Sequence, residues 1–130
     1  MVESHWLELA VSNPVLFVTN DFGPRAGGIE TFIIGLIERR PFGQTVVYTS
    51  SQPNSEQYDA DWLSNYGVRV IRDRSKILLP TPRVLFHLNK IIRNEGITTT
   101  AFGAAAPLGL LSAGMKRAGV KRTVALTHGH

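Results

Sequence analysis

VLFVTNDFGPRAGGIE, from Val15 to Glu30, is the segment of this chain that indicates its fold most clearly. Its first five residues are apolar or β-branched without interruption, as is typical of a central parallel strand that is covered on both faces. After the pair Gly27-Gly28, apolar residues fall at the i, i+3, i+4, i+7 spacing of one helical face, and Pro41 ends that pattern. The stretch therefore predicts a strand, a glycine loop and a helix in succession.

Such a loop suits a phosphate or another anion. Two glycines let the backbone approach a ligand closely, and the helix that follows directs its unpaired N–H groups and positive dipole end at the same point. The loop lacks the G-x-G-x-x-G pattern of dinucleotide-binding folds and the lysine of a kinase-type P-loop. A tight turn without a ligand is the alternative reading of the glycine pair.

The rest of the chain repeats the alternation of strands and helices. Strands are expected at 45–49, 68–71, 97–102 and 123–127, with a loop over 50–55. Thr81-Pro82 offers a helix N-cap followed by proline at the first helical position, and helical spacing then continues to Gly96. A helix of small residues is expected over 107–118. This order predicts an α/β fold with a doubly wound parallel, Rossmann-like sheet.

In such sheets, ligands bind beyond the carboxyl ends of the strands, near the point where the strand order reverses. Three motifs follow expected strands: the residues from Asn20 through the glycine loop, the stretch 102–107 (FGAAAP) and the terminal 128–130 (HGH). We expect them to converge on one crevice. A phosphoacceptor receiver domain is disfavoured, because Arg72 stands where its buried third strand would end in an acidic residue.

Composition limits the function classes. The chain has 130 residues, of which 43% are hydrophobic and 18% charged, enough for one domain with a core. It contains no cysteine, which excludes disulfides and thiolate metal sites. No apolar run is long enough to cross a bilayer, and the start carries Glu3 and Glu8 instead of a basic signal-peptide head. The cytoplasm is the expected location.

The net charge of +4 is unevenly distributed. In residues 1–61, acidic side chains outnumber basic ones, whereas in residues 69–122 basic side chains strongly outnumber acidic ones. The sequence therefore favours an anionic partner, such as an anionic membrane surface, and the expected contacts are Arg72, Arg74, Lys76 and Arg83. A solvated basic face is the alternative. A nucleic-acid partner is disfavoured, because the aromatic residues fall mostly in expected core runs.

The histidines at the end of the chain have two possible uses. His128 and His130 could face a metal, but no carboxylate or third ligand lies nearby in the sequence, so no metal site is expected. A histidine at a strand end in the crevice is better suited to hydrogen-bond a sugar hydroxyl or a developing charge. Asp21 could be an acid that only caps its own loop.

Three segments together resemble the amino-terminal domain of family 4 retaining glycosyltransferases: 15–30, 102–110 (FGAAAPLGL) and 127–130 (THGH). Within that family, they are most similar to mannosyltransferases that use GDP-mannose. The resemblance implies the amino-terminal half of a GT-B fold, in which two Rossmann-like domains face each other across a cleft. It implies transfer of mannose from GDP-mannose to a phosphatidylinositol mannoside, by a peripheral protein at the inner face of the plasma membrane.

The resemblance also implies roles for individual residues. Gly27 and Gly28 would approach the donor diphosphate, and the catalytic positions would be Asp21 and His128. Acceptor contacts are expected from Asn20, Arg25, Gly103 and Ala104. In the family, the leaving diphosphate helps to deprotonate the attacking hydroxyl, so no protein nucleophile and no metal or other cofactor is expected.

The sequence departs from the family pattern after His130, where an acidic residue and a donor-binding domain would follow. We therefore expect an extension over 1–13 and an acceptor-binding domain over 14–130, without transfer activity by itself. Two alternatives remain: a family 4 transferase with another sugar nucleotide or acceptor, and a non-catalytic anion-binding module.

Overall fold

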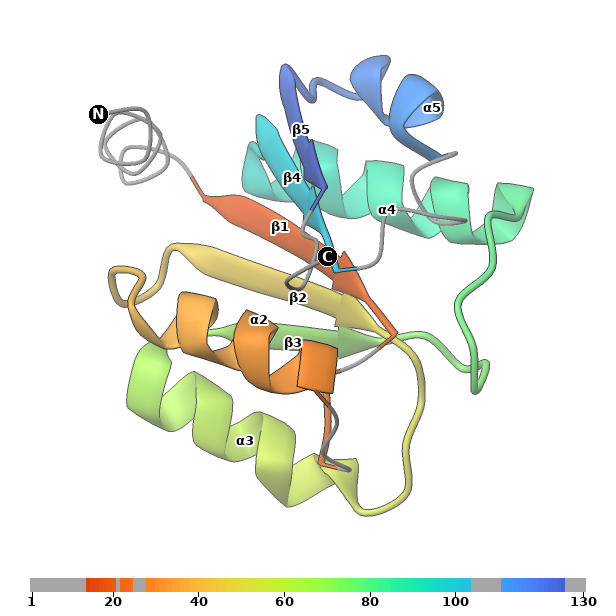
Figure 1. The fold of residues 1–130 in the computed structure, drawn as a ribbon. Coiled ribbons are helices and arrows are strands. Elements are labelled where there is room, and N and C mark those ends of the chain that lie inside the picture. Colours follow the sequence, from red (N-terminus) through yellow and green to blue (C-terminus); the bar gives the residue numbers. More distant parts are fainter. Residues whose placement is uncertain (1–13, 21, 25–27, 104–110, 126–130) are drawn as a thin grey trace.

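A computed structural model describes residues 14–20, 22–24, 28–103 and 111–125 of the chain. These residues form a three-layer α/β sandwich around a parallel sheet of five strands, in the order β3-β2-β1-β4-β5 (Figure 1). The strands are β1 (Val15–Thr19), β2 (Thr45–Thr49), β3 (Arg69–Arg72), β4 (Thr99–Phe102) and β5 (Arg122–Ala125). The strand order reverses between β1 and β4, so the predicted doubly wound topology is confirmed.

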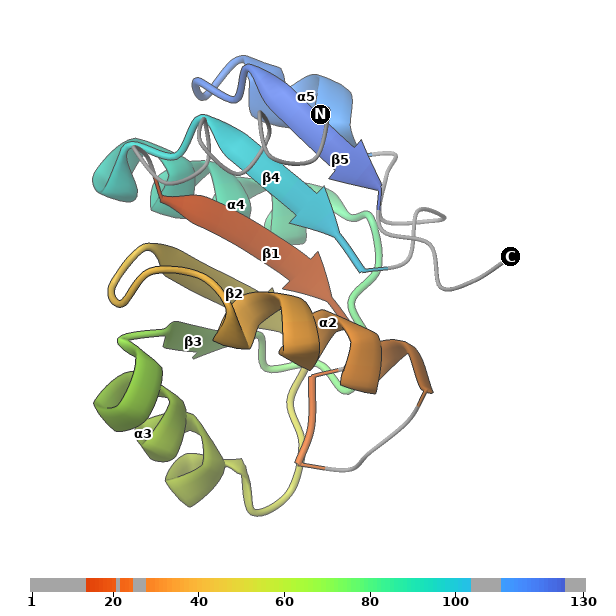
Figure 2. The same ribbon diagram turned by 60° about the vertical axis from the view of Figure 1, so that its left-hand side comes forward.

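Helices cover both faces of the sheet, as the continuous apolar strands predict. They are α2 (Gly28–Glu38), α3 (Ser55–Tyr66), α4 (Pro82–Glu95) and α5 (Ser112–Lys116). Figures 1 and 2 show α2 and α3 on one face and α4 and α5 on the other. Successive β1 residues face opposite layers: Phe17 packs in the core with α2 and α3, whereas Leu16 and Val18 pack in the core with α4 and α5.

The elements with strong periodicity or caps lie where the sequence predicts. β1 and β2 match their expected ranges, and α2 starts at the second loop glycine and ends before Pro41. In α4, the Thr81 side chain accepts a hydrogen bond from the Val84 N–H at 3.3 Å, and Gly96 closes the helix at φ 68°. These contacts are the predicted N-cap and its glycine counterpart at the other end.

Helix α3 is the element that the sequence reading missed. It follows the expected loop directly, and only one of its residues, Trp62, is buried. Its polar sequence, SEQYDADWLSNY, therefore lacks the apolar stripe from which helices are usually recognised. Three of its aromatic side chains, Tyr58, Trp62 and Tyr66, pack against one another and bring the helix to the sheet.

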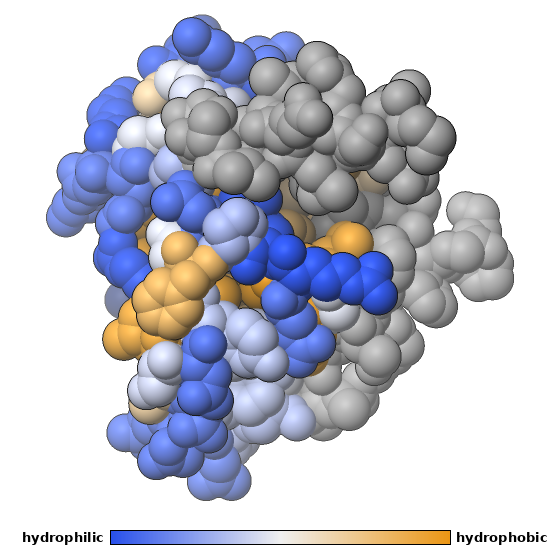
Figure 3. All heavy atoms as spheres, turned by 90° about the vertical axis from the view of Figure 1, so that its left-hand side faces the viewer, coloured by the Kyte–Doolittle hydropathy of each residue, from blue (hydrophilic) through white to orange (hydrophobic). Residues whose placement is uncertain are grey.

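Other boundaries differ by a few residues. β3 and β4 begin later than expected, and the described part of the fifth strand covers Arg122–Ala125. The expected helix over 107–118 is described only as α5. Figure 3 faces the amino-terminal edge of the sheet, where the described residues on view are mainly hydrophilic, with a small hydrophobic patch. The turn before β2 carries Phe42 at this edge, and its side chain is 68% exposed.

Candidate functional site: the carboxyl edge of the sheet

All strands are parallel, so the segments that follow them meet at one edge. β1 leads to Asn20, β2 to Ser50, β3 to Asp73 and β4 to Gly103. Helix α2 runs back along the sheet with its N-terminus at this same edge (Figure 1). Because Gly28 is the first helical residue, the unpaired N–H groups of the first turn lie where the loop after β1 ends.

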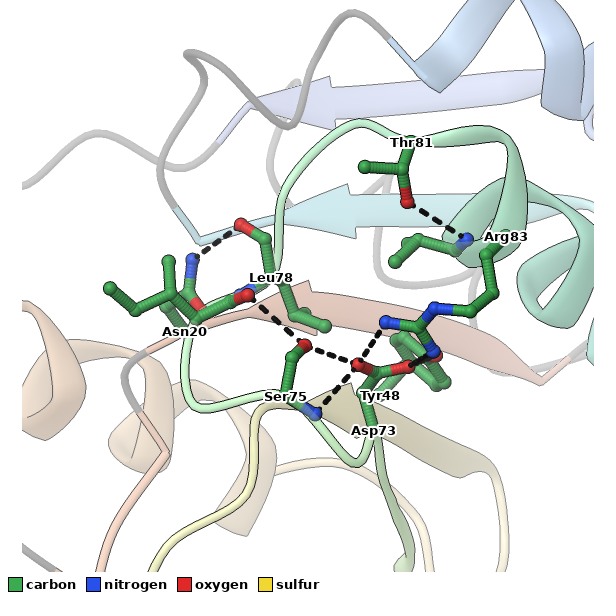
Figure 4. A network of polar contacts seen from close by, with 9 residues as sticks. Asn20, Tyr48, Asp73, Ser75, Leu78, Thr81 and Arg83 are labelled. Carbon is green, nitrogen blue, oxygen red and sulfur yellow. Dashed lines mark hydrogen bonds and ion pairs between the residues drawn. The ribbon is translucent and has the colours of Figure 1, made fainter.

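The loop after β1 is tied to the segment that follows β3. The Asn20 side-chain amide donates to the Leu78 carbonyl at 3.3 Å, and its Oδ1 accepts from the Leu78 N–H at 2.6 Å (Figure 4). Leu78 itself is fully buried. Asn20 was expected to contact an acceptor, but in this structure its amide holds another part of the protein backbone. The residue therefore shapes the edge of the site.

The next residues of this loop are fixed by helix α3 and strand β3. Phe22 is fully buried, and its carbonyl accepts a hydrogen bond from the Tyr58 hydroxyl at 2.7 Å. The Gly23 carbonyl accepts from Arg72 at 2.7 Å. Gly23 has a φ of 101°, and a Cβ there would lie 2.6 Å from the Tyr58 hydroxyl oxygen, so only glycine fits this position.

Gly103 also has a structural reason to be glycine. Its N–H donates to the Val18 carbonyl at 2.8 Å, which extends the contact between β4 and β1 at the reversal point. A Cβ on Gly103 would lie 2.6 Å from the Thr19 Cβ and 2.7 Å from the Ile33 Cδ1. The absence of a side chain lets the ends of β1 and β4 approach α2 closely.

A large polar cleft of about 1070 Å³ opens at this edge. It lies between the segments that follow β1, β2 and β3. Its walls carry hydroxyl and amide side chains, two prolines, one lysine and one isoleucine. The lining residues are Asn20, Pro24, Ser50, Ser51, Gln52, Pro53, Asn54, Lys76 and Ile77. Such groups can hydrogen-bond a polyhydroxylated ligand, and Lys76 can neutralise an anionic one.

The β2 contribution to this cleft was missed by the sequence reading, which treated residues 50–55 only as a loop. A polar SSQPN stretch directly after a buried strand was the available signal. This signal is weak, because serine, glutamine and asparagine are equally common in loops without a function.

Beside the cleft, Asp73 organises a network of polar contacts (Figure 4). Its side chain is almost fully buried, and its carboxylate accepts from the Tyr48 hydroxyl at 2.6 Å and from two Arg83 nitrogens at 2.8 and 2.9 Å. It also accepts from the Ser75 N–H at 3.0 Å and from the Ser75 hydroxyl. The Ser75 hydroxyl lies 3.1 Å from the Ile77 carbonyl, which continues the network towards the segment held by Asn20.

These contacts shift the pKa values of Asp73 and Tyr48. The hydrogen bonds from Arg83 hold the pKa of Asp73 well below its usual range, with further lowering by Ser75 and Tyr48. Burial, followed by the hydrogen bond to Asp73, raises the pKa of Tyr48 above its usual range. Asp73 is therefore a structural carboxylate that remains ionised, not a proton donor or acceptor near neutral pH.

The four residues expected at a membrane surface differ in their exposure and in their partners. Arg74 and Lys76 are exposed. Arg83 is paired with Asp73 and keeps about a third of its side chain exposed. The expectation for Arg72 is wrong: its side chain is 10% exposed, pairs with Asp59 at 2.8 Å and donates to the carbonyls of Ser50 and Gly23.

Five expected site residues, namely Asp21, Arg25, Gly27, Ala104 and His128, lie outside the described residues. Their roles remain predictions. Within the described ranges, no three His, Asp or Glu side chains are grouped in a way that could hold a metal ion. In the same part of the chain, the search for a helix long and apolar enough to span a membrane found none.

Comparisons with known proteins support the resemblance noted from the sequence. No family model matches the chain. Among curated proteins, it is 40% identical over 117 residues to the GDP-mannose-dependent alpha-(1-6)-phosphatidylinositol monomannoside mannosyltransferase of Mycolicibacterium smegmatis. It is 41% identical over 120 residues to the protein of that name from Mycobacterium tuberculosis. Each of these matches covers 89% of this chain.

A further relative is the GDP-mannose-dependent monoacylated alpha-(1-6)-phosphatidylinositol monomannoside mannosyltransferase of Corynebacterium glutamicum. It is 38% identical over 122 residues, which cover 94% of this chain. The chain spans only about 30% of the length of these relatives: 30%, 31% and 32%. Its sequence is therefore homologous, over nearly all of its own length, to about one third of a GDP-mannose-dependent phosphatidylinositol monomannoside mannosyltransferase.

Proposed function

We propose that this chain is the acceptor-side part of a retaining glycosyltransferase that transfers mannose from GDP-mannose to a phosphatidylinositol mannoside. The observation that carries the proposal is the identity of about 40% with mannosyltransferases named for this reaction, over 89% of the chain. The polar cleft at the carboxyl edge agrees with it, because a mannosylated inositol headgroup presents hydroxyl groups that serine, asparagine and glutamine side chains can bind.

In this proposal, the N-terminus of α2 serves the donor. Gly27 and Gly28 bring its unpaired N–H groups to the diphosphate, where the positive end of the helix dipole stabilises the charge of the leaving group. Asp21 and His128 contact the acceptor and the transferred mannose, with His128 orienting and stabilising the sugar. The leaving diphosphate helps to deprotonate the attacking hydroxyl, so the protein provides no nucleophile.

Acceptor contacts come from other positions at the carboxyl edge. Asn20 and Gly103 shape the backbone there, and Arg25 and Ala104 complete the proposed acceptor set. The anchored loop after β1 would keep this edge in place in the absence of ligand, because Phe22, Gly23 and Asn20 each bond a different element. Such preorganisation favours binding by reducing the conformational entropy lost when the acceptor binds.

A lipid acceptor requires contact with a membrane, and we place that contact on the segment Arg74–Leu79. Ile77 and Leu79 are 62% and 52% exposed, whereas Leu78 between them is fully buried. Arg74 and Lys76 supply positive charge beside the two exposed apolar side chains. This combination suits a peripheral protein at an anionic, cytoplasmic membrane surface.

The test is mannose transfer by a chimera. The matching third of the Mycolicibacterium smegmatis relative is replaced by this chain, and transfer of labelled mannose to phosphatidylinositol monomannoside is measured. A chimera that is folded by circular dichroism should use GDP-mannose and leave UDP-glucose unused, whereas this chain alone should show no turnover. Turnover by this chain alone would contradict the assignment as an acceptor part. A folded chimera without transfer would favour another acceptor or a non-catalytic anion-binding module.

A further inference from the structure

A second, smaller recess lies beside the large cleft, where the polar network around Asp73 forms part of its walls. Its volume is about 340 Å³, and no residue lines both cavities. Three arginines, a histidine, a tyrosine and an aspartate form its walls: Arg72, Arg74, Arg83, His87, Tyr48 and Asp73. Three guanidinium groups in one small cavity are more positive charge than its structural ion pairs require.

The carboxylate in this recess is already neutralised. Asp73 receives hydrogen bonds from Tyr48, from Ser75 and from two nitrogens of Arg83. Because a carboxylate has about four lone-pair sites, these partners leave Asp73 little capacity for further donors. Its negative charge therefore does not repel an anion as an unpaired carboxylate would.

Arg83 is held in place while part of its donor set stays available. A guanidinium has five N–H donors, and Arg83 uses two of them on Asp73, which leaves three for a ligand. Its side chain is 34% exposed, so the remaining donors are accessible from solvent. His87 follows at i+4 on helix α4, a spacing that places both side chains on one face of the helix.

The charge balance of the recess is positive. Arg72 pairs with Asp59 and Arg83 pairs with Asp73, whereas Arg74 has no carboxylate partner among the described residues and is exposed. One whole positive charge therefore remains, besides any charge on His87. A recess with a fixed guanidinium, an unpaired guanidinium and an imidazole offers more donors than a single carboxylate ligand can accept.

We propose that this recess binds a phosphate group, held by Arg74, Arg83 and His87. Its tetrahedral arrangement of acceptor oxygens matches several converging N–H donors, and the volume accommodates a phosphate with an attached small polyol. The shared chemistry is that of a phosphate anion, and its source is either free phosphate or the phosphodiester of an inositol lipid headgroup. With the second source, the inference rests on the proposed function, because the acceptor named there carries that phosphodiester.

The test is a titration of the 130-residue chain, at constant ionic strength, with two soluble probes. Inorganic phosphate represents the free anion, and glycerophosphoinositol represents a lipid headgroup without its acyl chains. NMR signals of the Arg74 and Arg83 side chains and the His87 ring report binding. We expect saturable shifts at these groups, and the probe that binds more tightly identifies the source.

Arg74→Gln is the informative variant, because Arg74 is exposed and outside the structural ion pairs. Its matched control is Arg122→Gln, which removes the same charge from β5, the outer strand farthest from β3 in the sheet. We expect Arg74→Gln to weaken binding roughly tenfold, as for loss of a charge-assisted hydrogen bond, and Arg122→Gln by less than about twofold. A second variant, His87→Gln, should also weaken binding.

Two outcomes would overturn the proposal. One is a set of shifts that grow linearly with both probes, because that behaviour indicates a diffuse ion atmosphere. The other is saturable binding that Arg74→Gln and Arg122→Gln weaken equally, because only the net charge of the chain would then matter.

Discussion

Gly103 shows how a single residue sets the geometry of the carboxyl edge. It lies at the strand reversal, where a Cβ would meet Thr19 and Ile33. We expect Gly103→Ala to lower the free energy of unfolding by about 1–3 kcal/mol, the usual cost of overpacking. The control is Gly35→Ala in α2, where a Cβ would meet nothing within 4 Å and should add about 0.5–1 kcal/mol. Urea unfolding measures both, and equal effects would contradict the packing argument.

Asp73 gives a prediction about pH. Its pKa in the folded protein lies below the ordinary value of about 3.9. The stabilisation of the fold by the ionised carboxylate is therefore fully present above that pH, and it declines as the pH falls from there towards the folded pKa. We expect Asp73→Asn to cost about 2–4 kcal/mol in unfolding free energy at pH 7, because a neutral amide cannot accept the hydrogen bonds that the buried carboxylate receives from Tyr48, Ser75 and Arg83.

The pH series is the informative part of that experiment. The difference between the native chain and Asp73→Asn should shrink as the pH is lowered below about 4, because Asp73 then takes up a proton in the unfolded chain while it stays ionised in the folded chain. Asp61→Asn serves as the control, because Asp61 is exposed and its hydrogen-bond partner among the described residues is Gln57 within α3, so its effect should stay within about 0.5 kcal/mol. A difference that is constant from pH 7 to pH 3 would show that ionisation of Asp73 is not the stabilising factor.

At the scale of elements, Arg72 joins three segments that are far apart in sequence. From β3, it bonds Asp59 in α3, the Ser50 carbonyl after β2 and the Gly23 carbonyl after β1. We expect Arg72→Gln to lower the unfolding free energy by about 2–4 kcal/mol, because it leaves a partly buried carboxylate and two carbonyls without donors.

Arg69 provides the comparison on the same strand. It forms an ion pair with Glu95, but half of its side chain is exposed, so Arg69→Gln should change the stability by no more than about 0.5–1 kcal/mol. Chemical denaturation of the two variants under identical conditions tests the ranking. If Arg69→Gln is as destabilising as Arg72→Gln, then burial is not what gives the Arg72 contacts their weight.

The elements also differ in how clearly the sequence predicts them. β1, β2 and α4 were predicted because continuous apolar runs, proline and caps are local signals. Helix α3 was missed because it attaches through one aromatic side of a polar sequence. Asn20 and Gly103 lie directly after β1 and β4, as predicted, but their roles in a site stay predictions. The burial of Arg72 and the hydrogen bond between Asn20 and Leu78 were not predicted, because both depend on partners that are distant in the sequence.

For the whole molecule, the placement of exposed apolar groups gives a prediction about membranes. The double variant Ile77→Ser, Leu79→Ser should bind vesicles of four parts phosphatidylcholine to one part phosphatidylinositol roughly tenfold less tightly than the native chain, since it removes two exposed apolar side chains. Phe42→Ser at the amino-terminal edge is the control and should leave binding unchanged. Vesicle sedimentation measures the binding. Binding that depends neither on salt nor on phosphatidylinositol content would refute the proposed membrane surface.

We propose that this chain holds the acceptor of a mannosyl transfer at the carboxyl edge of its sheet. An amide NMR titration of the 130-residue chain with a deacylated phosphatidylinositol monomannoside and, separately, with GDP-mannose tests this. We expect saturable shifts at Asn20, Ser51 and Gly103 with the acceptor analogue, and much weaker binding of GDP-mannose. No saturable shift with the acceptor analogue, or shifts confined to the amino-terminal edge around Phe42, would contradict it.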